Sequence, residues 1–160
     1  GSPGNIRNFI FTYLRTAYLY FHAGRNAEAI NCLKKGIYLP DRYRIDDKKS
    51  MEYYNQAYNN MSYYQIVNHE PAKAVDNALL ALQNTRRSDT LTRAANTVNL
   101  VFAYIFNEQF SSAQRSILRF KADYPSSFAD FAKMVNSDRQ EYEGRNMIHK
   151  EFGQLQELLK

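Results

Sequence analysis

Apolar residues recur at intervals of three and four positions along most of the chain, and no stretch alternates with the period of two that a strand shows. The clearest run lies between residues 6 and 22, where Ile10, Leu14, Ala17 and Phe21 fall on one face of a helix. Because this spacing places apolar side chains on one helical stripe, the pattern predicts an all-α protein.

Turn and capping residues divide this pattern into separate helices. We expect helices over about 6–22, 27–38, 48–67, 72–84, 90–106, 110–123, 127–142 and 146–159. Pro40 is expected to end the second helix, because proline lacks the N–H group that a helix interior needs. The expected N-cap residues are Asp46 or Asp47 for the third helix, Ser88-Asp89 for the fifth, and Ser126 or Ser127 for the seventh.

Small residues recur at matching places in successive helix pairs. Ala29, Ala74 and Ala113 each follow a short turn. Twelve residues before them lie Ala17, Ser62 and Val101. Two helices approach closely where side chains are small, so these positions are expected to mark the crossing points of antiparallel helices. One such pair cannot bury its own apolar face, and the pairs must therefore stack on one another.

With these anchors the sequence resembles the tetratricopeptide repeat (TPR) family over residues 13–40, 58–82 and 97–125. The resemblance implies a right-handed superhelical stack of antiparallel helix hairpins, a TPR-like α-solenoid. It places three hairpins at about 5–40, 47–85 and 89–124, within 5–125, and leaves 126–160 as a capping element or a fourth helix pair. Residues 1–4 resemble the remnant of an expression tag, and we expect the chain to be part of a longer protein.

The sequence departs from the family pattern in two respects. Its anchors lie 45 residues apart (Ala29 to Ala74) and 39 residues apart (Ala74 to Ala113), whereas the family repeats every 34 residues or so. The second repeat also has Gln65 where an aromatic residue is usual and His69 where glycine is usual.

In the TPR family the first helix of each hairpin lines a concave groove that holds a peptide or a helix. The groove residues implied here are Leu14, Tyr18, Phe21, Asn59, Asn60, Tyr63, Asn99, Phe102 and Phe106. Of the cationic and amide residues with which some members bind a C-terminal carboxylate, only Asn60 is present, so we do not expect such a clamp. The aromatic and Asn residues instead favour an apolar peptide or amphipathic helix, although the same aromatic residues also fit a buried core.

Charge leaves two other functions open. The chain has 21 Lys and Arg residues against 16 Asp and Glu, a net charge of +5. Basic residues gather near one turn (Arg86, Arg87, Arg93) and on one helix (Arg115, Arg119, Lys121). They suit a nucleic-acid-associated module, but a solvated face is the interpretation that the composition favours. The amphipathic helix expected at 146–159 leaves a self-associating regulatory domain of a bacterial protein as the other alternative.

We find no motif for catalysis. His22, His69 and His149 do not have the spacing of metal ligands, and no phosphate-binding or nucleophile motif is present. Cys32 lies on an apolar face and is expected to be a small buried residue. The sequence therefore predicts a protein that is not an enzyme, that needs no cofactor, and whose partner is a protein or peptide. We expect no membrane contact in this segment, and a cytoplasmic location is favoured over the bacterial periplasm.

Overall fold

The computed structural model describes residues 3–43 and 48–160, and in this part of the chain it contains helices and no strand. The helices are α1 (Pro3–His22), α2 (Asn26–Tyr43), α3 (Lys48–Val67), α4 (Pro71–Gln83), α5 (Thr90–Phe106), α6 (Phe110–Asp123), the short 3-10 helix η1 (Pro125–Ser127), α7 (Phe128–Gly144) and α8 (Phe152–Leu158). The prediction of an all-α protein is confirmed for these residues. Residues 1 and 2 of the expected tag remnant lie outside them.

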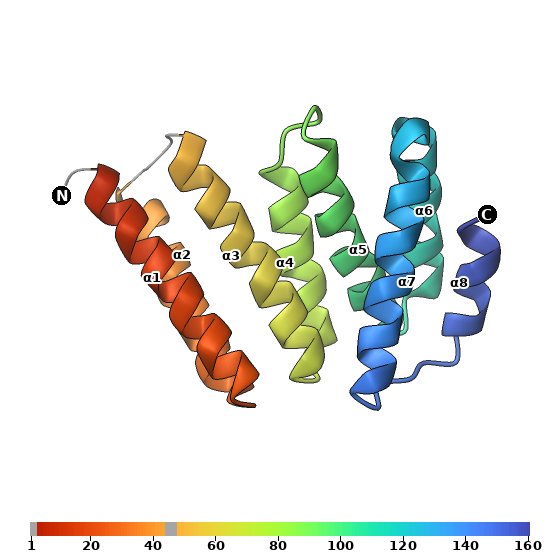
Figure 1. The fold of residues 1–160 in the computed structure, drawn as a ribbon, viewed down its shortest axis with the longest axis horizontal. Coiled ribbons are helices and arrows are strands. Elements are labelled where there is room, and N and C mark those ends of the chain that lie inside the picture. The colour runs from red at the N-terminus through yellow and green to blue at the C-terminus, as the bar shows by residue number, and fades with distance from the viewer. Residues whose placement is uncertain (1–2, 44–47) are drawn as a thin grey trace.

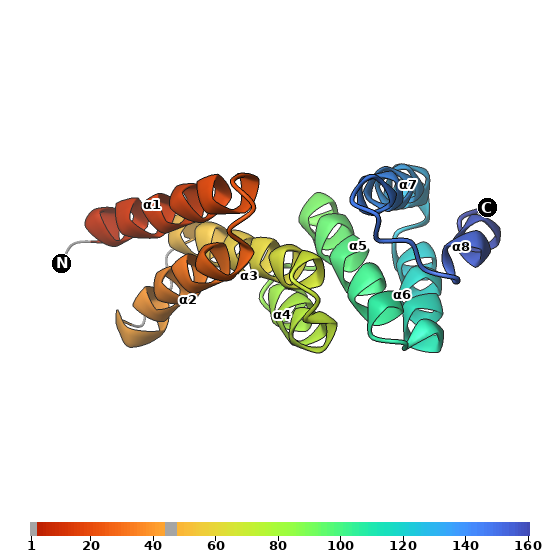
Figure 2. The same cartoon turned by 90° about the horizontal axis from the view of Figure 1, so that it is seen from below.

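The helices form two layers along one row (Figures 1 and 2). One layer holds α1, α3, α5 and α7, and the other holds α2, α4, α6 and α8. Within the row, α1 packs against α2, α3 against α4 and α5 against α6. In the first layer, α1 contacts α3, α3 contacts α5 and α5 contacts α7. The N-terminal and C-terminal ends of the chain lie at opposite ends of the row (Figure 1).

Small side chains lie where the two helices of a pair cross. The six expected crossing residues, Ala17, Ala29, Ser62, Ala74, Val101 and Ala113, are all fully buried. The Ser62 hydroxyl donates a hydrogen bond of 2.9 Å to the Ala74 carbonyl across the second pair. In the first pair, a Cβ atom at Gly36 would lie 3.0 Å from Cβ of Tyr13, so glycine permits the close approach of α1 and α2 there.

The turns that follow α1, α3, α5 and α7 share one backbone geometry. Each contains one residue in the left-handed region, and these are Gly24 (φ 77°), His69 (φ 60°), Glu108 (φ 59°) and Asn146 (φ 59°). In each turn the next residue donates its N–H to the carbonyl five residues before it: Arg25 to Tyr20, Glu70 to Gln65, Gln109 to Tyr104 and Met147 to Tyr142. The turn after α7 thus repeats the turns after α1, α3 and α5.

The prediction that Pro40 ends the second helix was wrong, because α2 continues to Tyr43. The φ of proline is close to the helical value, so the backbone can continue for three residues beyond Pro40, although a proline inside a helix removes one hydrogen bond and crowds the carbonyl four residues before it. The expected cap at Asp46 or Asp47 lies outside the described residues. Asp89 does cap α5, since its carboxylate accepts a hydrogen bond from the Thr92 N–H. Ser127 stands at the N-cap position of α7, but its hydroxyl makes no capping hydrogen bond.

The last predicted helix was too long. It was expected over 146–159, but α8 begins at Phe152. The left-handed backbone at Asn146 ends the helical path, and the segment between α7 and α8 crosses to the second layer, where α8 packs against α6. Ile148 lies on this connection with 73% of its surface exposed, whereas Phe152 and Leu155 of α8 are buried.

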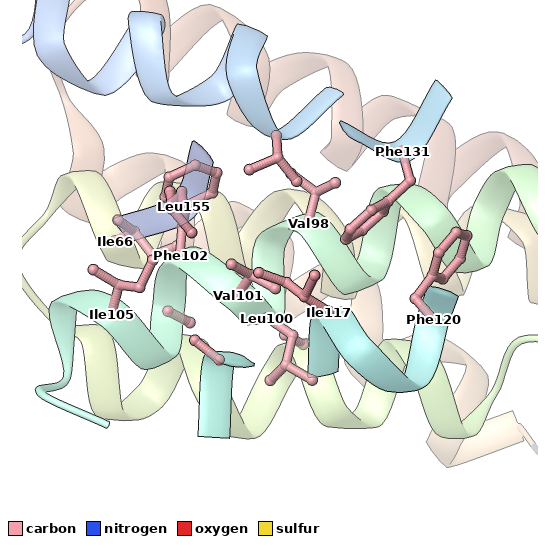
Figure 3. Close-up of a cluster of buried hydrophobic side chains, with 14 of the residues drawn as sticks. Ile66, Val98, Leu100, Val101, Phe102, Ile105, Ile117, Phe120, Phe131 and Leu155 are labelled. Atoms are coloured by element: carbon pink, nitrogen blue, oxygen red, sulfur yellow. The ribbon is translucent and has the colours of Figure 1, made fainter. Parts of the chain in front are cut away.

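The apolar core divides into two clusters along the row. One cluster joins α1, α2 and α3. The other surrounds α5 with side chains of α3, α4, α6, α7 and α8 (Figure 3). In Figure 3, Val98 and Phe102 of α5 lie among Ile117 of α6, Phe131 of α7 and Leu155 of α8. Helix α5 is therefore the most enclosed element, and α1 keeps one side open to solvent.

Candidate functional site

Two hollows lie side by side on the layer formed by α1, α3 and α5. The first is about 260 Å³ and lies between α1 and α3. The second is about 310 Å³ and lies between α3 and α5. Gln56 of α3 lines both hollows, so they are neighbours on either side of this residue, and we refer to the two together as the depression on α1, α3 and α5.

The first hollow contains three of the groove residues expected from the sequence, Leu14, Tyr18 and Asn60. Leu14 forms its buried floor, while Tyr18 is 54% exposed at its rim. Phe11, which is 47% exposed, adds a second ring to the same hollow. An apolar floor with exposed rings and amide side chains can hold an apolar side chain while pairing with a neighbouring backbone group.

The second hollow has an acidic lining. Glu52 and Asp89 face it, together with the amides of Asn55, Asn59 and Asn96, and no Lys or Arg lines it. The two carboxylates make this end of the depression attractive to a cation. Asn59 is the one expected groove residue that contributes here.

Asn59 and Asn99 join α3 to α5. The Asn59 amide donates to Asn96 Oδ1 at 2.5 Å, and the buried Asn99 amide donates to the Asn59 carbonyl at 3.1 Å. Asn96 in turn donates to the Thr85 hydroxyl at 3.0 Å. These three amides pair with one another or with Thr85. Gln56 and Asn60 in the first hollow, and the buried Oδ1 of Asn55 in the second, have no hydrogen-bond partner among the described residues.

The remaining expected groove residues lie in one run of aromatic contacts: Tyr63, Phe102 and Phe106 surround Tyr142 of α7, and Phe21 packs against Tyr63 with ring centroids 5.3 Å apart. The Tyr142 ring is fully buried, with centroids 5.8 Å from Tyr63, 4.9 Å from Phe102 and 5.2 Å from Phe106. Phe102 is fully buried and Phe21 is buried. The end of α7 therefore occupies the part of the predicted groove that these aromatic residues line.

Glu141 of α7 and Arg145, which directly follows α7, contact this cluster. The Tyr63 hydroxyl donates a hydrogen bond to the Glu141 carboxylate, and burial together with that carboxylate raises the pKa of Tyr63. The Arg145 guanidinium lies 4.9 Å from the centre of the Phe21 ring. These contacts fix the end of α7 against α1 and α3.

Sequence reasoning missed Tyr142 as the centre of this cluster. The signal was present, because Phe128, Phe131, Val135 and Tyr142 follow one another at helical spacing on α7 and all four are buried. Asp138 interrupts that stripe, and burial, with the neighbouring Glu141 charge, raises the pKa of its carboxyl to about 6.

Cys32 is half-buried and reduced, so the expectation of a buried residue holds only in part. Burial raises the pKa of its thiol, which disfavours the thiolate form needed for nucleophilic chemistry. Among residues 3–43 and 48–160, no three His, Cys, Asp or Glu side chains are grouped in a way that would hold a metal ion. No helix in this part of the chain is both long enough and apolar enough to cross a membrane.

The chain matches no family model, no curated protein and no solved structure with which it was compared.

Proposed function

We propose that the chain is a TPR-like helical module that binds an extended segment of another protein in the depression formed by α1, α3 and α5. Three features support a TPR-like α-solenoid: the fully buried crossing residues, the row of helix pairs and the repeated turn geometry. The turn after α7 supports the view that 126–160 is a fourth, splayed pair, with α8 against α6.

The pair of neighbouring hollows that meet at Gln56 of α3 is the observation that carries this proposal. Its first hollow exposes the rings of Phe11 and Tyr18 beside the amides of Gln56 and Asn60. A soluble domain exposes grouped aromatic side chains of this kind mainly at sites of interaction. Amides at the same place favour an extended peptide over a helix, because the backbone groups of a helix are already paired internally.

The two hollows specify different side chains of that peptide. The first has an apolar floor at Leu14 and accommodates an aromatic or aliphatic residue. The second contains Glu52 and Asp89 and accommodates Lys or Arg. The proposed ligand is therefore an extended segment with an apolar residue followed or preceded by a basic one.

Peptides selected from a random displayed library on the wild-type protein are expected to carry this apolar–basic pattern. Tyr18→Ala is expected to weaken their binding at least tenfold, because a half-exposed ring at a binding centre contributes affinity more than stability. Glu52→Lys is expected to lower the affinity of the selected peptides, and the loss should be larger for peptides that carry more Lys or Arg. Isothermal titration calorimetry of the selected peptides measures both effects.

The matched control is Tyr38→Ala on α2. Tyr38 is 55% exposed, close to the 54% of Tyr18, and it belongs to the second layer. Its replacement should leave peptide affinity unchanged. Equal affinity for wild type, Tyr18→Ala and Glu52→Lys would show that the depression is not the binding site.

A further inference from the structure

A larger hollow opens on the other layer, where α4 and α6 flank α5. It is about 510 Å³, and its lining runs along α6 from Ser112 to Asp123. Eleven helical steps of about 1.5 Å make this a trough roughly 16 Å long. Thr97, Leu100 and Phe120 form its buried floor. This trough shares no lining residue with the depression on α1, α3 and α5.

The trough is strongly basic. Arg93, Arg115 and Arg119 line it, and Asp123 is the one acidic residue in its lining. Within the described part of the chain, none of the three arginines forms an ion pair. Their charges are therefore not neutralised by the protein and produce a positive potential in a partly enclosed space.

Hydrogen bonds hold two of these arginines in place without cancelling their charge. The Arg93 guanidinium donates to the carbonyls of Leu82 at 3.3 Å and Thr85 at 3.0 Å. The Arg115 guanidinium donates to the Ser112 hydroxyl at 3.0 Å. Carbonyl and hydroxyl oxygens are neutral acceptors, and the remaining N–H groups suit a carboxylate.

Apolar side chains lie beside the arginines. Leu79 of α4 lines the trough with 43% of its surface exposed, next to Leu82 and Tyr104. The walls at Leu79, Arg115 and Arg119 are open to solvent, so a small molecule on the floor would leave these apolar and charged groups uncovered. A segment of polypeptide lying along the trough would cover both walls at once.

We propose that this trough binds an acidic amphipathic helix of a partner protein, with its carboxylates on Arg93, Arg115 and Arg119 and its apolar side chains against Leu79 and Leu82. The arginines of α6 on one wall and the leucines of α4 on the other match a helix that carries Glu or Asp along one side and apolar residues along the adjoining side, each at spacings of three and four. This site is separate from the proposed peptide site and opposite to it in charge preference.

The test uses a displayed library of 16-residue helix-forming peptides selected on the wild-type protein, with bound peptides eluted by high salt. Selected peptides are expected to be acidic and amphipathic. Their affinity, measured by fluorescence anisotropy, should fall at least tenfold in Arg115→Glu/Arg119→Glu, because reversal of two exposed charges turns attraction into repulsion. The affinity for wild type should also fall as salt screens the contacts.

Lys34→Glu/Lys35→Glu on α2 is the matched control, because it makes the same change in net charge at two exposed residues. It should bind the selected peptides like wild type, and so should Tyr18→Ala, which affects only the other site. If Arg115→Glu/Arg119→Glu loses its helical circular-dichroism signal, the neutral variant Arg115→Gln/Arg119→Gln is used in its place.

Three results would overturn the proposal. One is the recovery of no acidic amphipathic peptide from the library. Another is equal weakening in the α2 and α6 charge variants, which would mean that net charge alone attracts the peptides. The third is displacement of the peptide by a single-stranded oligonucleotide or by phenyl phosphate at lower concentration than by unlabelled peptide, which would assign the trough to a nucleic acid or a small anion.

Discussion

Tyr142→Ala is expected to lower the free energy of unfolding by about 3–5 kcal/mol, the range found when a large buried aromatic side chain is removed from a packed core. Its ring is fully buried between α3 and α5 and packs on Tyr63, Phe102 and Phe106. Removing the ring leaves a void that several helices must close together. Urea denaturation followed by circular dichroism measures the loss.

Tyr142→Phe separates the ring from its hydroxyl. The Tyr142 hydroxyl oxygen is buried without a hydrogen-bond partner in the described residues. Burying an unpaired hydroxyl costs about 1–3 kcal/mol, so removing it is expected to leave the protein as stable as wild type or up to about 1 kcal/mol more stable. A loss of stability in Tyr142→Phe would show that the hydroxyl is hydrogen-bonded. A loss below about 1 kcal/mol in Tyr142→Ala would show that the end of α7 does not fill the aromatic cluster.

Local signals in the sequence predicted several elements to the residue. The helices at 48–67, 90–106 and 110–123 have the predicted bounds. Each of these bounds rests on residues near in sequence, such as the Asp89 carboxylate that caps α5. The crossing residues were also found, because a close contact between two helices of one pair demands a small side chain at a fixed offset.

The predicted groove shows that local sequence patterns do not contain the contacts between helices that are far apart in the chain. An aromatic residue on the inner face of a first helix has the same spacing whether a ligand or another helix covers it. Tyr63 and Tyr142 are 79 positions apart in the chain, and their contact depends on how α7 lies across α5 and α3. The sequence therefore identified the face on which Leu14, Tyr18 and Asn60 lie, but not the part of it that α7 fills.

The Asn residues show the same limit at shorter range. Asn59 and Asn99 were predicted to line the ligand groove, but the Asn59 amide pairs with Asn96 and the Asn99 amide with the Asn59 carbonyl. An Asn side chain can form hydrogen bonds to a ligand or to a neighbouring helix equally well. Which of the two it does here depends on the distance between α3 and α5, which the sequence does not show. Gln56 and Asn60 instead line the hollow between α1 and α3.

Asp138→Asn is expected to stabilise the protein at pH 8 by roughly 1–3 kcal/mol. Asp138 lies on the buried stripe of α7, where burial and the Glu141 charge raise the pKa of its carboxyl from 3.8 to about 6. At pH 8 this carboxylate is ionised although it is largely shielded from water in the folded protein, which lowers the stability of the folded state. An asparagine has nearly the same shape and carries no charge, so the variant avoids that cost.

The sign of the pH dependence follows from the raised pKa. Between pH 3.8 and about 6 the folded state binds the Asp138 proton more strongly than the unfolded state does, so stability from this group is greatest below pH 3.8 and is lost as the pH rises through 6. The advantage of Asp138→Asn over wild type should therefore grow from near zero at pH 4 to its full value above pH 7.

Urea denaturation of both proteins across this range measures the difference, in which the titration of other carboxylates cancels. Asp76→Asn, at an exposed position of α4 beyond its first turn, is the control and should change the stability by less than about 0.5 kcal/mol. A difference between wild type and Asp138→Asn that stayed constant from pH 4 to pH 8 would mean that the Asp138 carboxyl is well solvated, and α7 would then lie less closely against α5 than the burial of Tyr142 requires.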